Sequence, residues 1–405
     1  MKQPNLFYNN SLHRIFHILV FLLVLNIPES SGQLNTLYGI GAGGSITTGT
    51  FNSIYGHVAG GNITTQKSNS FFGNAAGGLS TGSSNSFFGR NSGTFSTGSS
   101  NSFFGLSAGF LNTTGKENTF VGASSGSNNS TGINNVALGY QALQSNNTAS
   151  RIVAVGSGAL KNSRGPIGTE APFVGSQNTA IGNNAGIENT TGFLNTYIGN
   201  SAGFTTSTGD YNTCIGAGSG LSNRTGSGNT FIGESAGRWV WGHSNIMIGY
   251  NAGPEVNASS ISNKLYIDIN DTRVGNSQPL IYGEFDNNFV KINGTFEVTA
   301  GLSNPSDVNL KNNFNQINEE EILEKISLLD LQQWTYIERP DELHIGATAQ
   351  DFHAAFGLGA DDKHISTIDA DGVALAAIKA LKKENDKLRA ELLELKSIVN
   401  KMRHK

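Results

Sequence analysis

Polar and apolar residues recur along most of this chain with a short fixed period. Thirteen times a glycine follows two mostly apolar residues, and consecutive glycines of this set lie 16 or 17 residues apart, except for one step of 26. One unit runs from Asn229 to Gly233, and a polar stretch of Ser, Thr, Gly and Asn separates it from the next unit. A short fixed period is typical of a solenoid, in which each repeat adds one coil to a stack. The thirteen glycines are Gly39, Gly56, Gly73, Gly89, Gly105, Gly122, Gly139, Gly156, Gly182, Gly199, Gly216, Gly233 and Gly249.

The two apolar positions before each glycine differ in how strictly size is kept. The residue directly before the glycine is large in every repeat, from Tyr38 to Ile248, so we expect it on the buried face of a short strand. The residue one earlier varies from Ala137 to Phe87 and should face the opposite way, because neighbouring strand residues alternate. We expect this variable position to pack against a second layer or another chain. The glycine itself should serve a positive φ or the close approach of stacked coils.

Residues 33–254 are therefore predicted to form a parallel β-roll or solenoid of about 13 short repeats, which makes the chain mainly β. So thin a roll holds little apolar volume, and a core shared among three chains would remedy that. The alternative is a disordered linker rich in Gly, Ser and Asn, because such a composition often cannot offset chain entropy. Low complexity alone would not place a bulky apolar residue at the same phase in every repeat.

The last part of the chain changes to a helical period. Eight mostly apolar residues follow alternating steps of three and four without a slip, which is the heptad pattern of a coiled coil over residues 374–403. Asn385 stands at a core position, where a polar residue tends to fix register and oligomer state. The alternative is an amphipathic helix that packs within one chain. The predicted core residues are Ile378, Leu381, Asn385, Leu388, Leu392, Leu395, Val399 and Met402.

Between these parts, residues 255–302 lose the period and are predicted to form a β-rich neck. Residues 303–405 should then form a small α+β domain that ends in the coiled coil. The last two strands of the neck are expected to be joined about Asn293-Gly294. The expected strands of the neck are 265–269, 280–283, 289–294 and 295–299.

Charge separates the two ends of the chain. Residues 33–253 hold 13 charged residues, whereas residues 301–405 hold 31 charged residues and only 5 of the 52 glycines. The formal net charge of −4 and the lack of a basic stripe argue against a nucleic-acid partner. The repeats contain no Asp/Glu pair or His/Cys cluster with catalytic or metal-ligand spacing. A conventional enzyme is therefore the least supported class, and we expect no metal and no small-molecule cofactor.

The first 32 residues are predicted to be a secretion signal. Basic residues precede an apolar run from Ile15 to Ile27, and Ser30-Ser31-Gly32 offers small residues for cleavage before Gln33. The run is shorter than the roughly 20 residues of a membrane span. We therefore expect an exported protein, located outside the cell or on a bacterial cell surface. The alternative is an uncleaved N-terminal anchor.

Three features interrupt the repeat. Cys214 is the only cysteine, which excludes an internal disulfide, and we expect a packed side chain rather than a reactive thiol. An insertion that contains Pro166 and Pro172 should leave the roll as a loop, either a tolerated insertion or a binding loop. The segment from Arg238 to Trp241 either covers the end of the roll or forms a binding hot spot.

One pair of residues after the neck carries candidate chemistry. Ser306 and Lys311 place a hydroxyl and an amine five residues apart. Such a pair can cut a peptide bond if burial keeps the lysine neutral, so that it takes the proton of the serine. Alternatively, Ser306-Asp307 after Pro305 simply begins a helix as an N-cap.

The repeat itself is similar to a known family. Units such as Asn134–Gly139 and Asn178–Gly182 resemble the head repeats of trimeric autotransporter adhesins, the YadA-like heads. The resemblance covers about residues 34–253 and implies a trimeric parallel β-roll with an adhesive surface. The repeat of this chain is a little longer than that family's usual one, and the C-terminal membrane-anchor barrel of the family is missing.

A second resemblance begins at Ser306. The motifs that carry it are Ser306–Lys311, Ile322–Leu331, Trp334-Thr335-Tyr336, His344-Ile345-Gly346 and Ala349-Gln350-Asp351, followed by the coiled coil. Their order resembles the C-terminal intramolecular chaperones of phage endosialidases, tail spikes and related fibres. Over residues 303–405, the resemblance implies a domain that drives trimerisation of a β-rich fibre and then cuts itself off.

The second resemblance also implies roles for individual residues. By position, Ser306 would be the nucleophile, Lys311 the general base, and Pro305–Ser306 the bond that is cut. The chain departs from the family pattern at Asn309, where a basic residue is common, and at Ala347-Thr348, where bulkier residues are usual.

These features predict a secreted or cell-surface homotrimeric fibre with an adhesin-like head, assembled and then released by its own C-terminal domain. Strand pairing among three chains is slow, and misregistered coils resemble correct ones, so a C-terminal trimeriser would hold the chains in phase. The surface ligand or receptor of the head is not identified by the sequence. The alternatives are a phage tail-fibre-type receptor-binding protein, which shares the terminal domain, and an ice-binding β-solenoid that uses ranks of Ser and Thr.

Overall fold

The computed structural model describes residues 34–165, 173–254, 260–269, 278–299, 304–337 and 339–404. The chain splits into two compact units, which divide between Phe296 and Glu297. The predicted secretion signal and the prolines of the predicted insertion lie outside the described residues. Within the described ranges, no helix is both long enough and apolar enough to cross a membrane.

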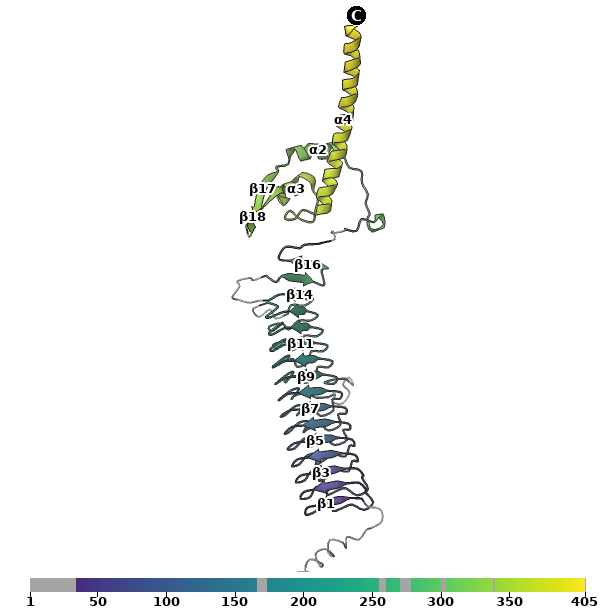
Figure 1. The fold of residues 1–405 in the computed structure, drawn as a ribbon, viewed down its shortest axis with the longest axis vertical. Helices are drawn as coiled ribbons and strands as arrows, with labels where there is room; N and C mark the ends of the chain where they lie inside the picture. Colours follow the sequence, from purple (N-terminus) through teal and green to yellow (C-terminus); the bar gives the residue numbers. More distant parts are fainter. Residues whose placement is uncertain are drawn as a thin grey trace, which may run out of the picture. The chain divides into compact units, whose positions relative to one another are not determined.

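The first unit is a parallel β-roll, as the period predicts (Figure 1). Each coil contributes one strand of three residues, and the strands pair in sequence order and in register, so that Phe71 lies beside Phe87 and Phe72 beside Phe88. The strands are β1 (Thr36–Tyr38), β2 (Ser53–Tyr55), β3 (Ser70–Phe72), β4 (Ser86–Phe88), β5 (Ser102–Phe104), β6 (Thr119–Val121), β7 (Val136–Leu138), β8 (Val153–Val155), β9 (Thr179–Ile181), β10 (Thr196–Ile198), β11 (Thr213–Ile215), β12 (Thr230–Ile232) and β13 (Ile246–Ile248). The prediction of a mainly β chain with about 13 solenoid turns is confirmed.

The repeated glycine after each strand meets both of its predicted requirements. Gly73 has a φ of +141°, a conformation that a residue with a side chain rarely adopts. A Cβ on Gly73 would also stand 2.6 Å from the backbone oxygen of Gly89 in the next coil. The period is therefore kept because the chain must turn there while the coils touch.

The predicted inward and outward faces of the strand are reversed in the structure. The variable position, occupied for example by Phe71 or Ala137, is fully buried inside the coil, whereas the large residue before the glycine, such as Phe72, faces outward. The physical reason lies two residues earlier, where an asparagine such as Asn69 is also fully buried. Residues two apart share a face of a strand, so this asparagine brings the variable position inside with it.

The interior absorbs the size variation within each coil. Six residues after a buried aromatic residue the chain has glycine, and a Cβ on Gly77 would collide with the ring of Phe71. Where the buried residue is Ala137, the position six later is Leu143, which is also fully buried and keeps the left-handed φ of +53°. Between these coils the large and the small residue exchange positions, which keeps the interior filled. Where both are small, at Ala180 and Gly186, side chains of Tyr197 and Leu160 occupy the space.

Buried asparagines at the strand starts fasten each coil to the next. The amide of Asn212 donates to the backbone oxygen of Gly226 at 2.8 Å, and its Oδ1 accepts from the backbone N–H of Asn229 at 3.1 Å. Equivalent bonds recur along the roll, for instance from Asn101. A buried polar side chain is stable here because all of these groups are paired.

The neck extends the same sheet and corrects part of the prediction. β14 (Lys264–Ile267) pairs in parallel with β13, and β15 (Ile281–Glu284) and β16 (Phe289–Ile292) then follow in antiparallel pairing. The hairpin turn therefore falls at residues 285–288 rather than at Asn293-Gly294, and residues 295–299 form no strand. Asn288, with a φ of +50°, supplies the left-handed position that such a turn needs.

The second unit has one short turn, a two-stranded sheet and three helices within the described residues. Helix α2 packs along α4, and Asn318 caps the start of α2 by accepting from the backbone of Glu321. The elements are the 3₁₀ turn η1 (Val308–Leu310), α2 (Glu319–Leu328), β17 (Gln332–Tyr336), β18 (Arg339–Gly346), α3 (Ala349–Phe356) and α4 (Thr367–Arg403).

Candidate functional site

A single capped turn brings Ser306 and Lys311 together. The carboxylate of Asp307 accepts from the backbone N–H of Asn309 at 2.9 Å and caps the turn η1, which the bond from Leu310 N to Asp307 O closes. Lys311 then returns over the start of the turn, and its Nζ donates to Ser306 Oγ at 2.6 Å. The cap is thus Asp307, which leaves the Ser306 hydroxyl to the lysine.

The positions at which the chain departs from the family pattern have identifiable contacts. The side-chain amide of Asn309 donates to Asp307 at 2.9 Å. Thr348 caps α3 by accepting from the backbone N–H of Asp351 at 3.1 Å. Neither departure removes a partner of Ser306 or Lys311.

The Ser306–Lys311 pair is open to solvent in the single chain. Every residue from 304 to 318 is exposed. A lysine must lose its proton to act as a base, and burial is what favours the neutral amine. The single chain therefore holds the two groups in place but leaves the amine solvated.

An ion-pair cluster fixes the segment that follows the pair. The carboxylate of Glu319, the first residue of α2, accepts from Lys379 and Lys383, which lie one turn apart on α4. The hydrogen bond from Lys379 and then that from Lys383 lower the pKa of Glu319. The exposed segment that carries Ser306 is therefore tied to α4 at its C-terminal end. No sequence pattern predicts this cluster, because Glu319 lies 60 and 64 residues before its two lysine partners.

Helix α4 presents two different faces. Its small apolar residues, Val373, Ala376, Ala377 and Ala380, are buried within the second unit. The predicted coiled-coil seam lies on another face and stays exposed in the single chain, including Leu388 and Leu392. The heptad residues therefore do not pack within the chain, which argues against the amphipathic-helix alternative.

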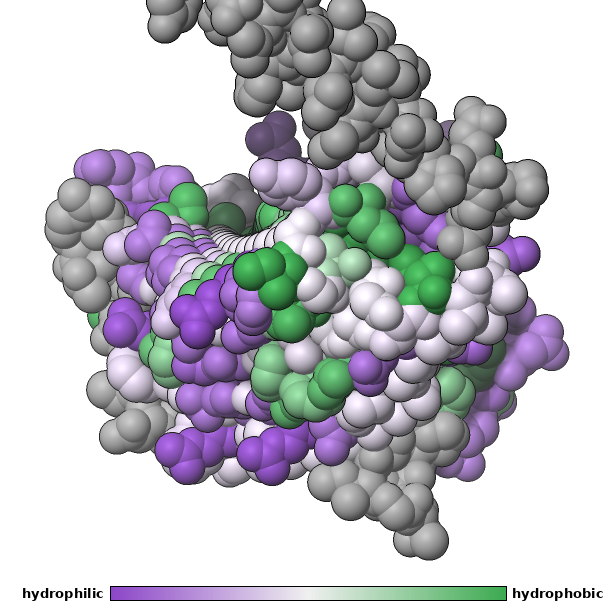
Figure 2. All heavy atoms as spheres, turned by 90° about the horizontal axis from the view of Figure 1, so that it is seen from below, coloured by the Kyte–Doolittle hydropathy of each residue, from purple (hydrophilic) through white to green (hydrophobic). Residues whose placement is uncertain are grey.

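The outward residues before the glycines form a continuous apolar stripe along the roll. At its N-terminal end the rings of Tyr55, Phe72, Phe88 and Phe104 stack with centroids 4.7–4.8 Å apart. Towards β13 the stripe becomes aliphatic and remains accessible, for example at Ile232, which is 37% exposed. Figure 2 looks along the roll from the end that carries β1 and shows hydrophobic side chains at the surface among polar ones. The sequence pattern predicts these residues on the buried face, and the structure corrects that prediction.

Two further candidates, Cys214 and the segment Arg238–Trp241, lie in the roll. Cys214 is buried, and burial raises the pKa of its thiol to about 12, as expected of a packed side chain rather than a reactive one. The guanidinium of Arg238 lies 5.0 Å from the ring centroid of Trp239, and Trp239 and Trp241 are partly exposed near the end of the roll.

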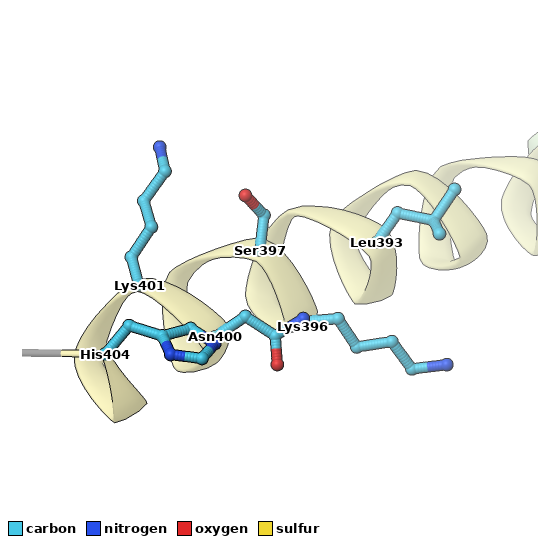
Figure 3. Close-up of a pocket in the computed structure, with 6 residues that line it drawn as sticks. All are labelled: Leu393, Lys396, Ser397, Asn400, Lys401 and His404. Carbon is cyan, nitrogen blue, oxygen red and sulfur yellow. The ribbon is translucent and has the colours of Figure 1, made fainter.

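The described residues contain no cluster of metal-binding side chains. No group of three or more His, Cys, Asp or Glu that could hold a metal ion occurs in the described ranges. One surface hollow lies along the end of α4, where the side chains fan out from a single helix (Figure 3). Its residues are Leu393, Lys396, Ser397, Asn400, Lys401 and His404.

Comparison with known proteins gives one family match, in the C-terminal unit. Residues 306–357 match the family model described as chaperone of endosialidase. The match begins at Ser306 and ends at Gly357, which closes α3 in the left-handed conformation. No curated protein and no solved structure matches the chain. The predicted resemblance to an intramolecular chaperone is thus confirmed for residues 306–357.

Proposed function

We propose that this chain is a self-associating, homotrimeric fibre protein whose C-terminal unit drives assembly and then cuts itself off at Pro305–Ser306. The observation that carries the proposal is the hydrogen bond from Lys311 to Ser306 at the start of a segment that matches the chaperone of endosialidase. Neither the spacing alone nor the match alone would have identified the two atoms.

The proposed cleavage needs only the two side chains and water. As a neutral amine, Lys311 takes the proton of Ser306 Oγ, and Oγ attacks the carbonyl carbon of Pro305. A C–O bond forms, the C–N bond between Pro305 and Ser306 breaks, and the proton passes from Lys311 to the departing nitrogen of Ser306. Water then hydrolyses the ester, which restores the Ser306 hydroxyl and leaves a carboxylate on Pro305.

Two exposed apolar surfaces support self-association. The seam of α4 has the heptad pattern that a partner helix would cover, and the outer stripe repeats once per coil over the whole roll. A second copy offers the same spacing between coils and is therefore the partner that matches the stripe along its full length. Stacked rings present their edges outward, so the aromatic end of the stripe favours protein packing over stacking on a flat ligand.

We further propose that the assembled roll is an exported, adhesin-like fibre outside the cell or on its surface. The N-terminal sequence pattern and the resemblance of the repeats to YadA-like heads support this assignment. The assembled roll would present the remaining polar faces, and the Arg238–Trp239 pair near its end, to a surface ligand or receptor.

A second candidate is a phage tail-fibre-type receptor-binding protein. The match of residues 306–357 favours it, because chaperones of this kind occur on phage fibres as well. N-terminal sequencing of the mature protein separates the two candidates. A chain that begins near Gln33 supports export, whereas a chain that keeps residues 1–32 supports the tail-fibre-type assignment.

The main proposal is tested by expressing the full chain and measuring intact mass and oligomeric state by light scattering. We expect a trimer of a product that ends at Pro305 and a separate fragment of residues 306–405. Ser306→Ala and Lys311→Arg should remain uncut, because an arginine side chain stays protonated and cannot act as the base. The matched controls Ser327→Ala and Lys325→Arg change an exposed and a half-buried residue of α2, both away from the pair in sequence, and should be cut normally.

Each part of the proposal has its own contrary result. A wild-type chain of full length that is indistinguishable from Ser306→Ala would remove the cleavage. A monomeric wild-type chain would remove the assembly role.

A further inference from the structure

We propose that an apolar arm, residues 306–318, leaves its own chain and packs on the β17–β18 hairpin of a second copy. The inference rests on the proposed homotrimer and adds to it a specific exchanged contact. The arm supplies apolar side chains without a cover, and the hairpin supplies an apolar face without a cover.

The arm has a composition unsuited to solvent. It carries Val308, Leu310, Phe314 and Ile317, all of which are exposed, with Phe314 at 68% and Leu310 at 73%. Among the described residues, the backbone groups of residues 312–317 make no hydrogen bond to another part of the chain. Four large apolar side chains on a segment tied to α4 only at its C-terminal end are typical of a segment that becomes ordered against a partner.

The hairpin is incomplete in the single chain. Its inner face holds Trp334 and His344, whose rings lie 4.8 Å apart. The opposite face holds Leu343 and Ile345, which are 65% and 75% exposed. A sheet of only two strands is marginal by itself and needs packing on an apolar face.

The position of the arm favours a second copy over its own hairpin. The ion pairs of Glu319 with Lys379 and Lys383 fix the end of the arm at α4, close to the first seam residues Ile378 and Leu381. In Figure 1 the arm and the hairpin of one chain are drawn on opposite sides of α4. The arm therefore points away from the hairpin of its own chain.

The assembled seam would bring a second hairpin within reach. Packed helices lie about 8–10 Å apart, so each α4 would place its partner's second unit beside the anchored C-terminal end of the arm. Twelve residues in extended conformation span about 40 Å, which is ample for this separation. A contact from the arm of one chain to the hairpin of the next is heterologous, and three such contacts close into a ring.

The exchange would also complete the Ser306–Lys311 site. The pair lies on the arm itself, so docking of the arm would carry both side chains from solvent to an interface between copies. Removal of water there favours the neutral amine that the proposed cleavage needs.

The test uses two full-length chains that differ in a tag and are expressed together, both with Ser306→Ala so that neither is cut. The tagged chain carries Phe314→Cys and the untagged chain carries Ile345→Cys, and a short bismaleimide is added to the folded protein. Cys214 is buried and stays unreactive. We expect a covalent pair that contains one tagged and one untagged chain.

In the matched control the untagged chain carries Glu342→Cys in place of Ile345→Cys. Glu342 is exposed and lies on the other face of β18, so the yield of the mixed pair should fall at least severalfold. A trimer by light scattering that gives no mixed pair would overturn the exchange alone. A further variant carries both Phe314→Cys and Ile345→Cys on one chain. A link between these two cysteines within that chain would also overturn the exchange. A monomer would overturn the proposed assembly and this inference with it.

Discussion

A Cβ on Gly77 would stand 2.6 Å from the Cε2 atom of the Phe71 ring, so the glycine exists to make room for that ring. The same two positions hold Ala137 and Leu143 further along the roll. There the first residue is small and the second is large, and both are fully buried. The two positions act as one packing unit, although they are six residues apart in sequence.

This unit predicts a compensating pair of substitutions. Phe71→Ala should lower the free energy of unfolding by about 3–5 kcal/mol, because it leaves a cavity inside the coil. Gly77→Leu alone should also destabilise, because Leu and the ring cannot share the space. The double variant should recover a large part of both losses, since it reproduces the pair Ala137–Leu143. Urea unfolding of the four proteins gives the coupling energy, and simple additivity would contradict the prediction.

The buried asparagine ladder predicts a site of high sensitivity within a polar repeat. Asn212→Ala should cost about 1–3 kcal/mol, because the backbone N–H of Asn229 loses its acceptor and the backbone oxygen of Gly226 keeps only the donor from Asn223. Asn200→Ala, at an exposed position whose side chain makes no ladder bond, serves as the control and should be nearly neutral. Equal thermal midpoints for the two variants would show that the ladder contributes nothing.

Adjacent leucines on α4 predict opposite outcomes for the oligomer. Leu392 belongs to the seam, whereas Leu393 lies beside it, and both are exposed in the single chain. Leu392→Ala should weaken the assembled coil by about 2 kcal/mol or more per chain, because the side chain becomes buried only on association. Leu393→Ala should leave the oligomer unchanged. Sedimentation at decreasing protein concentration measures the difference, and equal behaviour of the two variants argues for a single-chain helix.

The outer stripe predicts a substitution whose effect depends on assembly. Ile232→Thr changes a residue on the outer face of β12 and should reduce the resistance of the oligomer to urea. Val136→Thr also lies on an outer face, at the strand position where most coils already carry Ser or Thr, and should change little. If both variants dissociate at the wild-type urea concentration, the stripe is not an interface between copies.

The buried thiol of Cys214 can report local opening of the roll. Its burial should prevent maleimide labelling at neutral pH until the coil around it unfolds, so the labelling rate reports local opening. The thiol has a folded pKa of about 12, above its unfolded value near 9. Its contribution to stability is therefore complete below pH 9 and is lost as the pH rises towards 12. Rapid labelling of the folded protein at pH 7 would show that the roll is open there.

The spacing of Ser306 and Lys311 along the chain does not by itself decide whether their side chains meet. In an α-helix, residues five apart point in different directions, so a helical N-cap at Ser306 would have separated the two side chains. The structure instead has a short 3₁₀ turn capped by Asp307, and only this cap leaves Ser306 free to accept from Lys311. The resemblance to the chaperone family pointed to Ser306 and Lys311. Their geometry depends on Asp307, rather than Ser306, acting as the cap of the turn.

The sequence by itself determined the number of coils, the presence of one short strand in each, the place of each glycine and the heptad seam of α4. These features follow from periods of the backbone, which are the same wherever the element packs. Only the tertiary structure decided which side of the strand is the inside, because both positions before each glycine are apolar. Closure of the coil around Asn69 and its equivalents selected Phe71 for the interior and left Phe72 outside. Only the tertiary structure decides long-range contacts such as that of Glu319 with Lys383, because they form only when the helices pack.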